Sequence, residues 1–142
     1  MASTNIESPP ILYRRYKHRV RTQDSTTITI VPVIRHADKH EATSRYVDLY
    51  WTPIIGTDAS GLLRWISYQH RPVSMTETQL ATALGAHGRG QVRKAITSLI
   101  DCELATINDD VLRVSMTLPN LSVLQANRCG TAFANRHHHD AH

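Results

Sequence analysis

Three glycines within six residues divide what would otherwise read as one long helix. In the stretch LATALGAHGRGQVRKAITSLI, residues 80–100, apolar residues occur at helical spacing before Gly85 and again from Val92 onward. Glycine is unfavourable inside a helix and common where a helix ends, because it adopts left-handed backbone conformations without steric cost. The pattern therefore predicts two helices, over 75–84 and 90–102, joined by a sharp turn.

Further regular elements are expected on both sides of this helix pair. The segment ASGLLRWISYQH, residues 59–70, carries an apolar stripe at helical spacing. Ser74 and Glu77 have the spacing of a capping box at the start of the helix 75–84. Two short apolar runs within 104–116 surround the polar residues 108–110, which is typical of a hairpin. This order predicts a mainly α fold with a small β-hairpin, in the α+β class.

Composition along the chain suggests three regions. Residues 1–45 are expected to form a basic N-terminal arm with a possible short strand over 26–34, and Pro32 favours an edge position for it because proline cannot donate to a central ladder. Residues 46–128 are expected to form the folded domain, with a helix interrupted at Pro53 and a last helix over 120–128. Residues 129–142 form a His-rich tail that we expect to be frayed.

Two segments of the central region resemble the winged helix-turn-helix signature. QLATALG and GQVRKAITSLIDCELA are similar to an L-A-x-x-L-G helix, a short turn and a V-R-x-A-[LI]-x-x-L helix that precede a strand, although the turn here is one residue longer than the commonest spacing. Residues 50–56 and 118–121 resemble motifs of small, mostly uncharacterised actinobacterial or phage winged-helix proteins. The resemblance covers 46–128 and implies a winged helix-turn-helix with an extended basic N-terminal arm.

The helix 90–102 is the expected recognition helix, and the hairpin 104–116 is the expected wing. No Asp or Glu occurs from Thr78 to Ile100, so this surface should attract phosphates. Arg, Lys and Gln side chains bind phosphates or base edges, and hydroxyl groups add smaller contacts. Alternation with Leu112 and Val114 predicts that Arg113 projects outward from the wing. The expected DNA-binding residues are Arg89, Gln91, Arg93, Lys94, Thr97, Ser98 and Arg113.

The basic N-terminal segment ILYRRYKHRVRT, residues 11–22, contains five cations and no acidic residue. The whole chain has a net charge of +4 at pH 7, which favours a polyanionic partner. We expect the arm to contact the DNA backbone without sequence preference, with a solvated basic tail as the alternative. The cations of this arm are Arg14, Arg15, Lys17, Arg19 and Arg21. Because one recognition helix supplies little specificity, the expected protein is a homodimeric transcriptional regulator that binds double-stranded DNA.

Other classes of function find little support in the sequence. The chain contains no P-loop, HExxH or GxSxG motif, so we expect neither catalysis nor a cofactor. The segment HHHDAH, residues 137–142, lies at a terminus and the other histidines lack ligand spacing, so no metal site is expected. The two cysteines form no CxxC motif, and neither a signal peptide nor a membrane span is recognisable. We therefore expect a cytoplasmic, nucleoid-associated protein without membrane contact.

Two alternative functions stay open at this point. GAHG, residues 85–88, matches the G-x-x-G loop of RNA-binding KH modules. Against a KH module, Gln91 stands where an apolar residue is usual, and the helical segment 61–70 occupies the place of the strand expected before the first helix. The second alternative is a winged-helix module for protein interaction or dimerisation without DNA binding. Tyr46, Tyr50 and Trp51 are suited to a dimer surface, although aromatic residues are equally typical of a core.

Overall fold

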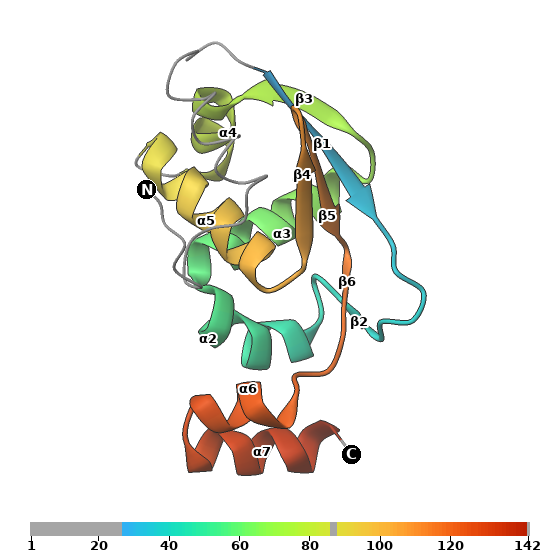
Figure 1. Ribbon diagram of the computed structural model, residues 1–142, viewed down its shortest axis with the longest axis vertical. Helices are drawn as coiled ribbons and strands as arrows, with labels where there is room; N and C mark the ends of the chain where they lie inside the picture. Colours follow the sequence, from blue (N-terminus) through green and yellow to red (C-terminus); the bar gives the residue numbers. More distant parts are fainter. Residues whose placement is uncertain (1–26, 86–87, 142) are drawn as a thin grey trace, which may run out of the picture.

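Helices and a small sheet form two layers in the computed structural model of the chain, which describes residues 27–85 and 88–141 (Figure 1). The sheet has four strands in the order β3-β1-β5-β4. Strand β1 is antiparallel to β3 and parallel to β5, and β4 and β5 form an antiparallel hairpin. The strands are β1 (Thr27–Val33), β3 (Val73–Thr76), β4 (Ala105–Asn108) and β5 (Val111–Ser115). The hairpin expected within 104–116 is confirmed, but the sheet around it is larger than expected.

Strand β1 is a central strand, so the expectation of an edge strand is wrong. Pro32 is accommodated because the backbone N–H and C=O groups of successive residues point to opposite edges of a strand, and so toward different neighbouring strands. The amide of Thr29 donates to the Asp110 carbonyl and the Val33 carbonyl accepts from Met116, so odd-numbered residues turn their backbone groups toward β5. Pro32 therefore turns toward β3, whose pairing with β1 has already ended at Ile30. The missing N–H costs no ladder hydrogen bond there.

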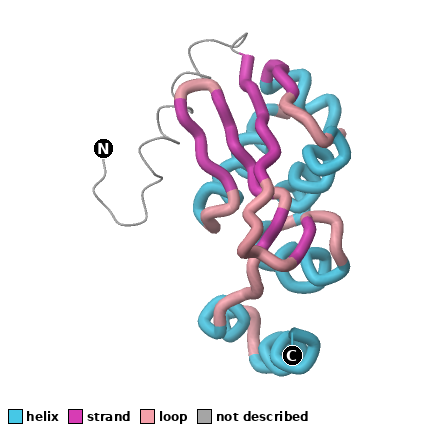
Figure 2. Tube along the Cα trace, turned by 90° about the vertical axis from the view of Figure 1, so that its right-hand side faces the viewer, coloured by secondary structure: helices cyan, strands magenta, loops and turns pink. Residues whose placement is uncertain are grey.

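Helices cover one face of the sheet. The helical elements of this layer are the π-helix η1 (Val47–Trp51), α2 (Thr52–Ile55), α3 (Thr57–Gln69), α4 (Glu77–Leu84) and α5 (Arg89–Asp101). Pro53 lies in the first turn of α2, where its missing N–H is harmless, and Gly56 then breaks the chain direction with a φ of 92°. Figure 2 shows the strands in front of these helices. The helices expected over 59–70, 75–84 and 90–102 are all present, with shifted ends.

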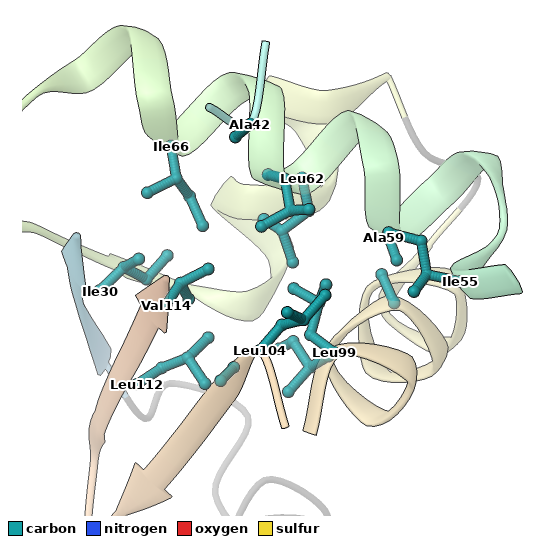
Figure 3. Packing of buried hydrophobic residues seen from close by; sticks show 14 of the residues in the cluster. Ile30, Ala42, Ile55, Ala59, Leu62, Ile66, Leu99, Leu104, Leu112 and Val114 are labelled. Atoms are coloured by element: carbon teal, nitrogen blue, oxygen red, sulfur yellow. The ribbon is translucent and has the colours of Figure 1, made fainter. Parts of the chain in front are cut away.

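A single apolar core lies between the two layers (Figure 3). Ile30, Leu112 and Val114 point from the sheet toward the helices, and each is fully buried. Leu62 and Leu99 meet them from α3 and α5. Each such side chain contributes about 1.5–3 kcal/mol by leaving water, so this interface is the main source of stability. Helix α5 is therefore fixed to the sheet by its apolar face.

The start of α4 differs from the expectation. Residues 73–76 form strand β3 beside β1, so the helix begins two residues later than the expected 75. The capping box is formed by Thr76 and Gln79, not by Ser74 and Glu77: the Thr76 hydroxyl accepts from the Gln79 amide, and the Gln79 side chain accepts from the Thr76 amide. Strand pairing thus displaces a helix start that fitted the sequence pattern equally well.

The C-terminal region is ordered, contrary to the expectation of a frayed tail. Strand β6 (Thr117–Leu118) pairs with β2 (His40–Glu41), and two helices follow, α6 (Val123–Arg128) and α7 (Thr131–Ala141). Helix α7 packs against η1, with the Tyr46 hydroxyl 2.6 Å from Nε2 of His137 and the Tyr50 hydroxyl donating to Asp140. Figure 1 shows this helix pair at one end of the molecule. Tyr50 and Trp51 are 1% and 2% exposed, so these aromatics are not a free dimer surface.

The described residues thus form a mixed α/β structure of the α+β kind. Both β1 and β2 lie ahead of the boundary expected at residue 46, yet each pairs with a strand that lies behind it. Within the described ranges, no helix has both the length and the apolar character needed to cross a membrane.

Candidate nucleic-acid interface

Helices α4 and α5 meet at the glycine-rich turn. Gly85 ends α4 with a φ of 68°, a left-handed conformation in which a side chain would be strained. Gly88 precedes α5 in an extended conformation that any residue adopts. Helix α5 buries Val92, Ala95, Ile96 and Leu99 and turns its other side away from the core. The contacts of each predicted DNA-binding side chain of α5 therefore depend on its position around the helix axis.

Arg93 is held by an ion pair within the protein. Its Nε donates to both carboxylate oxygens of Glu77, at 3.1 and 3.2 Å. Glu77 is 1% exposed and Arg93 is 19% exposed, so the pair is largely removed from water. A buried carboxylate is costly unless it is paired, so Arg93 supplies the charge that lets Glu77 stay inside. This pair joins the start of α4 to the middle of α5 and fixes their relative position.

Gln91 lies on the opposite edge of α5 and contacts α3. Its side-chain amide donates to Oδ2 of Asp58 at 3.3 Å, a long hydrogen bond at the surface. The side chain of Gln91 is half-buried, and it lines a groove between α3 and the two following helices. Gln91 and Arg93 thus both make contacts within the chain, toward α3 and α4 respectively.

Lys94 lies on the exposed side of α5, between these two edges. Its side chain is exposed, and so is Gly90 one turn earlier. Thr97 and Ser98 are half-buried, and the Thr97 hydroxyl donates to the Arg93 carbonyl at 2.7 Å. Arg89 is the first residue of the helix and is half-buried. Among the predicted residues, Lys94 is the one whose charge projects directly from the outward face of α5.

Arg113 belongs to a different surface. It is exposed on β5 between the buried Leu112 and Val114, so it projects as expected, but from the face of the sheet opposite to the helices. The turn of the hairpin carries Asp109 and Asp110, with Asp109 in a left-handed conformation at a φ of 56°. Two carboxylates at this turn oppose a close approach to phosphates. The hairpin therefore brings no cation to the outward face of α5 from its tip.

The predicted arm lies outside the described residues. Arg14, Arg15, Lys17, Arg19 and Arg21 all precede Thr27, at which the described chain begins. Thr27 pairs with Thr76, the N-cap of α4, and two residues later Thr29 donates to Asp110 in the hairpin turn. The first described residue thus lies beside the start of α4.

Glu77 is the residue of this region that sequence reasoning missed. It was interpreted as a capping residue because it stands three positions after Ser74. The available signal was its position: Glu77 directly precedes a stretch of 23 residues, 78–100, without another acid, and that stretch contains the cations that could neutralise it. A carboxylate at the margin of a basic surface can be the buried member of an ion pair as readily as a helix cap.

Other chemistries find little basis in the described part of the chain. Its histidine, cysteine and acidic side chains form no group of three or more that could hold a metal ion. Burial and, to a lesser degree, the charge of Asp101 raise the pKa of the Cys102 thiol, which disfavours the reactive thiolate. The chain matches no known protein family, no curated protein and no solved structure.

Proposed function

We propose that this protein is a winged helix-turn-helix protein that binds double-stranded DNA and regulates transcription, with α5 in the major groove. The element order α3, β3, α4, α5, β4, β5 supports this proposal, because a winged helix needs a supporting helix, a turn, a recognition helix and a hairpin in that order. Helix α3 packs along α5 and so completes a three-helix unit. A homodimer would provide the two recognition helices that a specific site requires.

The observation that carries the proposal is the outward face of α5. Its apolar residues are buried in the core, while Gly90 and Lys94 remain exposed. Two acidic residues flank this acid-free stretch: Glu77 is buried and neutralised by Arg93, whereas Asp101 is exposed at the end of α5. A helix held rigidly by one face, whose opposite face is basic at Lys94 and carries an exposed carboxylate only at its last residue, Asp101, has the chemistry that a major groove accepts.

The contacts within the chain refine the expected roles of single residues. Lys94 is the proposed DNA-contacting cation, with Thr97 and Ser98 as smaller contacts beside it. Arg93 would act by positioning α5 through Glu77. Arg113 would contribute only if DNA also approached the open face of the sheet, and the acidic hairpin turn argues against the tip as a phosphate contact. The basic arm 14–21 keeps its proposed role in sequence-independent affinity.

One observation favours the RNA-binding alternative. Strand β3 directly precedes α4, so the argument that no strand stands before the first helix of a KH module was wrong. The order β3, α4, the GAHG segment, α5, β4 is compatible with a KH module. The packing of α3 along α5 and the position of Gln91 still favour the winged helix.

The test compares the wild-type protein with Lys94→Ala on duplex DNA over a series of salt concentrations. We expect wild type to bind a random-sequence duplex at low salt, and Lys94→Ala to bind about fivefold more weakly with a salt slope lower by about one. Lys39→Ala is the matched control, because Lys39 is an exposed lysine outside α4 and α5. Selection from random duplexes should then enrich a defined motif with wild type.

Each outcome of this experiment decides one part of the proposal. Absence of duplex binding by wild type at low salt would refute DNA binding altogether. Equal affinity and equal salt slope for Lys94→Ala and Lys39→Ala would refute the role of the α5 face. Tighter binding to single-stranded RNA than to duplex DNA would support the KH alternative. Salt-dependent binding without an enriched motif would contradict sequence specificity.

A further inference from the structure

A groove opens between α3, the end of α4 and the start of α5. It lies on a different side of α5 from the side that contacts Glu77 in α4. It has a volume of about 350 Å³, which is in the range of small-molecule sites rather than of sites for folded partners. Its apolar wall includes Leu84, Val92 and Ala95, and its polar rim includes Asp58 and Gln91. Figure 1 shows the three helices that border it side by side.

Gly61 is a glycine that the fold itself does not require. It lies in the interior of α3, where glycine destabilises a helix relative to alanine. A Cβ built at this position would meet no atom within 4 Å, so no close packing in the described structure explains the glycine. Because Gly61 also lines the groove, a side chain here would occupy the open space. The glycine thus keeps free a volume that the protein does not fill.

Two aromatic side chains of α3 border the groove. Trp65 is partly buried against the core, while Tyr68 is 65% exposed, which is unusual for a large side chain with an apolar ring. Their rings offer a surface on which a flat aromatic molecule can pack, and tryptophan and tyrosine faces also attract cations. The aromatic part of the site therefore favours a ring system that carries a positive charge nearby.

The charges at the rim point to the same class of ligand. Arg64 lines the groove, but its guanidinium is paired with Asp48. Asp58 has one hydrogen bond, from the neutral Gln91, and no ion pair with any residue in the described ranges. An uncompensated carboxylate in the same groove as two aromatic side chains suits an amine and disfavours an acid.

We propose that this groove binds a small aromatic amine, with the ring beside Trp65 and Tyr68 and the ammonium group at Asp58. Gly61 leaves the room for the ring, and Leu84, Val92 and Ala95 form the apolar wall against it. The site is separate from the outward face of α5, and its occupancy does not depend on nucleic acid. Success or failure of DNA binding therefore leaves this proposal unaffected.

Titration with tryptamine, followed by the two tryptophan indole signals in NMR spectra without DNA, tests the proposal. The Trp65 signal should shift and saturate, while the signal of the core residue Trp51 serves as an internal reference. Indole-3-acetate has the same ring with a negative charge, and we expect it to bind at least about tenfold more weakly. Asp58→Asn should remove most of that difference between amine and acid.

Gly61→Leu fills the groove and should weaken tryptamine binding by more than about tenfold. Gln69→Leu introduces the same residue elsewhere on α3, outside the groove lining, and should bind as wild type does. If Gly61→Leu disturbs the Trp51 signal, Gly61→Ala replaces it, with a smaller loss expected. Undisturbed Trp65 signals with tryptamine, or equal binding by folded Gly61→Leu, would overturn the site. Equal affinity for amine and acid would overturn the ligand class.

Discussion

Two helix pairs of this protein are attached to the body by different forces. Helices α4 and α5 bury Leu80, Val92, Ile96 and Leu99, each at most 1% exposed, in the common core. Helices α6 and α7 bury little apolar surface: Val123 and Leu124 of α6 are 78% and 61% exposed. Apolar burial secures the first pair, whereas the second depends on a few specific contacts with η1.

The contacts of α7 are aromatic and polar. The Tyr46 hydroxyl accepts from the Leu121 amide at 2.8 Å and lies 2.6 Å from Nε2 of His137. Tyr50 donates to Asp140, and its ring meets Phe133 edge-on with centroids 5.4 Å apart. A region with few buried apolar contacts opens at lower free energy than the core does. We therefore expect α5 to be lost only when the whole fold unfolds, whereas α7 should open locally.

The largest expected effect comes from breaking the α4–α5 ion pair. Glu77→Gln keeps the shape of the side chain but leaves the partly buried charge of Arg93 without its partner. We expect the free energy of unfolding, measured by urea denaturation, to fall by about 3 kcal/mol. Removal of one partner of a buried pair costs about 3–5 kcal/mol, and the lower value applies because Arg93 is partly exposed to solvent.

The control for this change is Asp101→Asn, which neutralises an exposed carboxylate on α5, the helix that carries Arg93. Its effect on stability should stay within about 0.5 kcal/mol, as for most surface substitutions. Equal stability of the two variants would mean that Glu77 and Arg93 contribute little, and that apolar burial alone positions α5.

A smaller and local effect is expected from Tyr50→Phe. The change removes the hydroxyl that donates to Asp140 but keeps the buried ring, so it should destabilise the attachment of α7 by about 1.5 kcal/mol, as for a hydrogen bond to a charged group. Amide hydrogen exchange should accelerate in α7 and remain unchanged in α5. Uniform acceleration throughout the chain would contradict the distinction between the two helix pairs.

The start of α4 provides a third test. Thr76→Ala removes the hydroxyl that caps the helix and should cost about 1 kcal/mol in thermal or urea unfolding. Ser74→Ala removes only an exposed hydrogen bond to Thr29 in the sheet, 2.9 Å long, and should cost less than about 0.5 kcal/mol. A larger loss of stability for Ser74→Ala than for the other variant would identify Ser74 as the cap and contradict the observed end of β3.

The same contrast explains which parts of the fold could be predicted from the sequence. Helix α5 was predicted to within one residue at each end because Val92, Ala95, Ile96 and Leu99 repeat at helical spacing. Helix α7 was missed because its attachment depends on His137 and Asp140, which follow no apolar pattern. The central place of β1 was missed because proline argues against it locally, and only the ends of the neighbouring strands show that the missing N–H is harmless.

For the candidate site, the sequence located the helix better than the roles of its residues. It assigned Arg93 and Lys94 to the same surface because both are basic neighbours. Adjacent helical residues point about 100° apart, so one reaches Glu77 and the other solvent. Which residue does which depends on where α4 crosses α5, and this crossing is a tertiary property. The groove beside Gly61 is also formed by three separate helices and has no sequence signature.

The smallest effect that we expect is a pH dependence of the stability with which α7 is attached. Burial, together with the hydrogen bond and charge of Asp140, raises the pKa of Tyr50 to about 12. An unfolded tyrosine ionises near pH 10, so the folded state favours the neutral phenol. The resulting stability is complete below pH 10 and is lost as the pH rises toward 12. Between pH 9 and 10.3 the loss has only begun, so the stability difference between wild type and Tyr50→Phe should shrink slightly in urea denaturation. A difference that grows over this range would show that the Tyr50 phenolate is favoured in the folded state, and the neutral hydrogen bond to Asp140 would then be the wrong description of this contact.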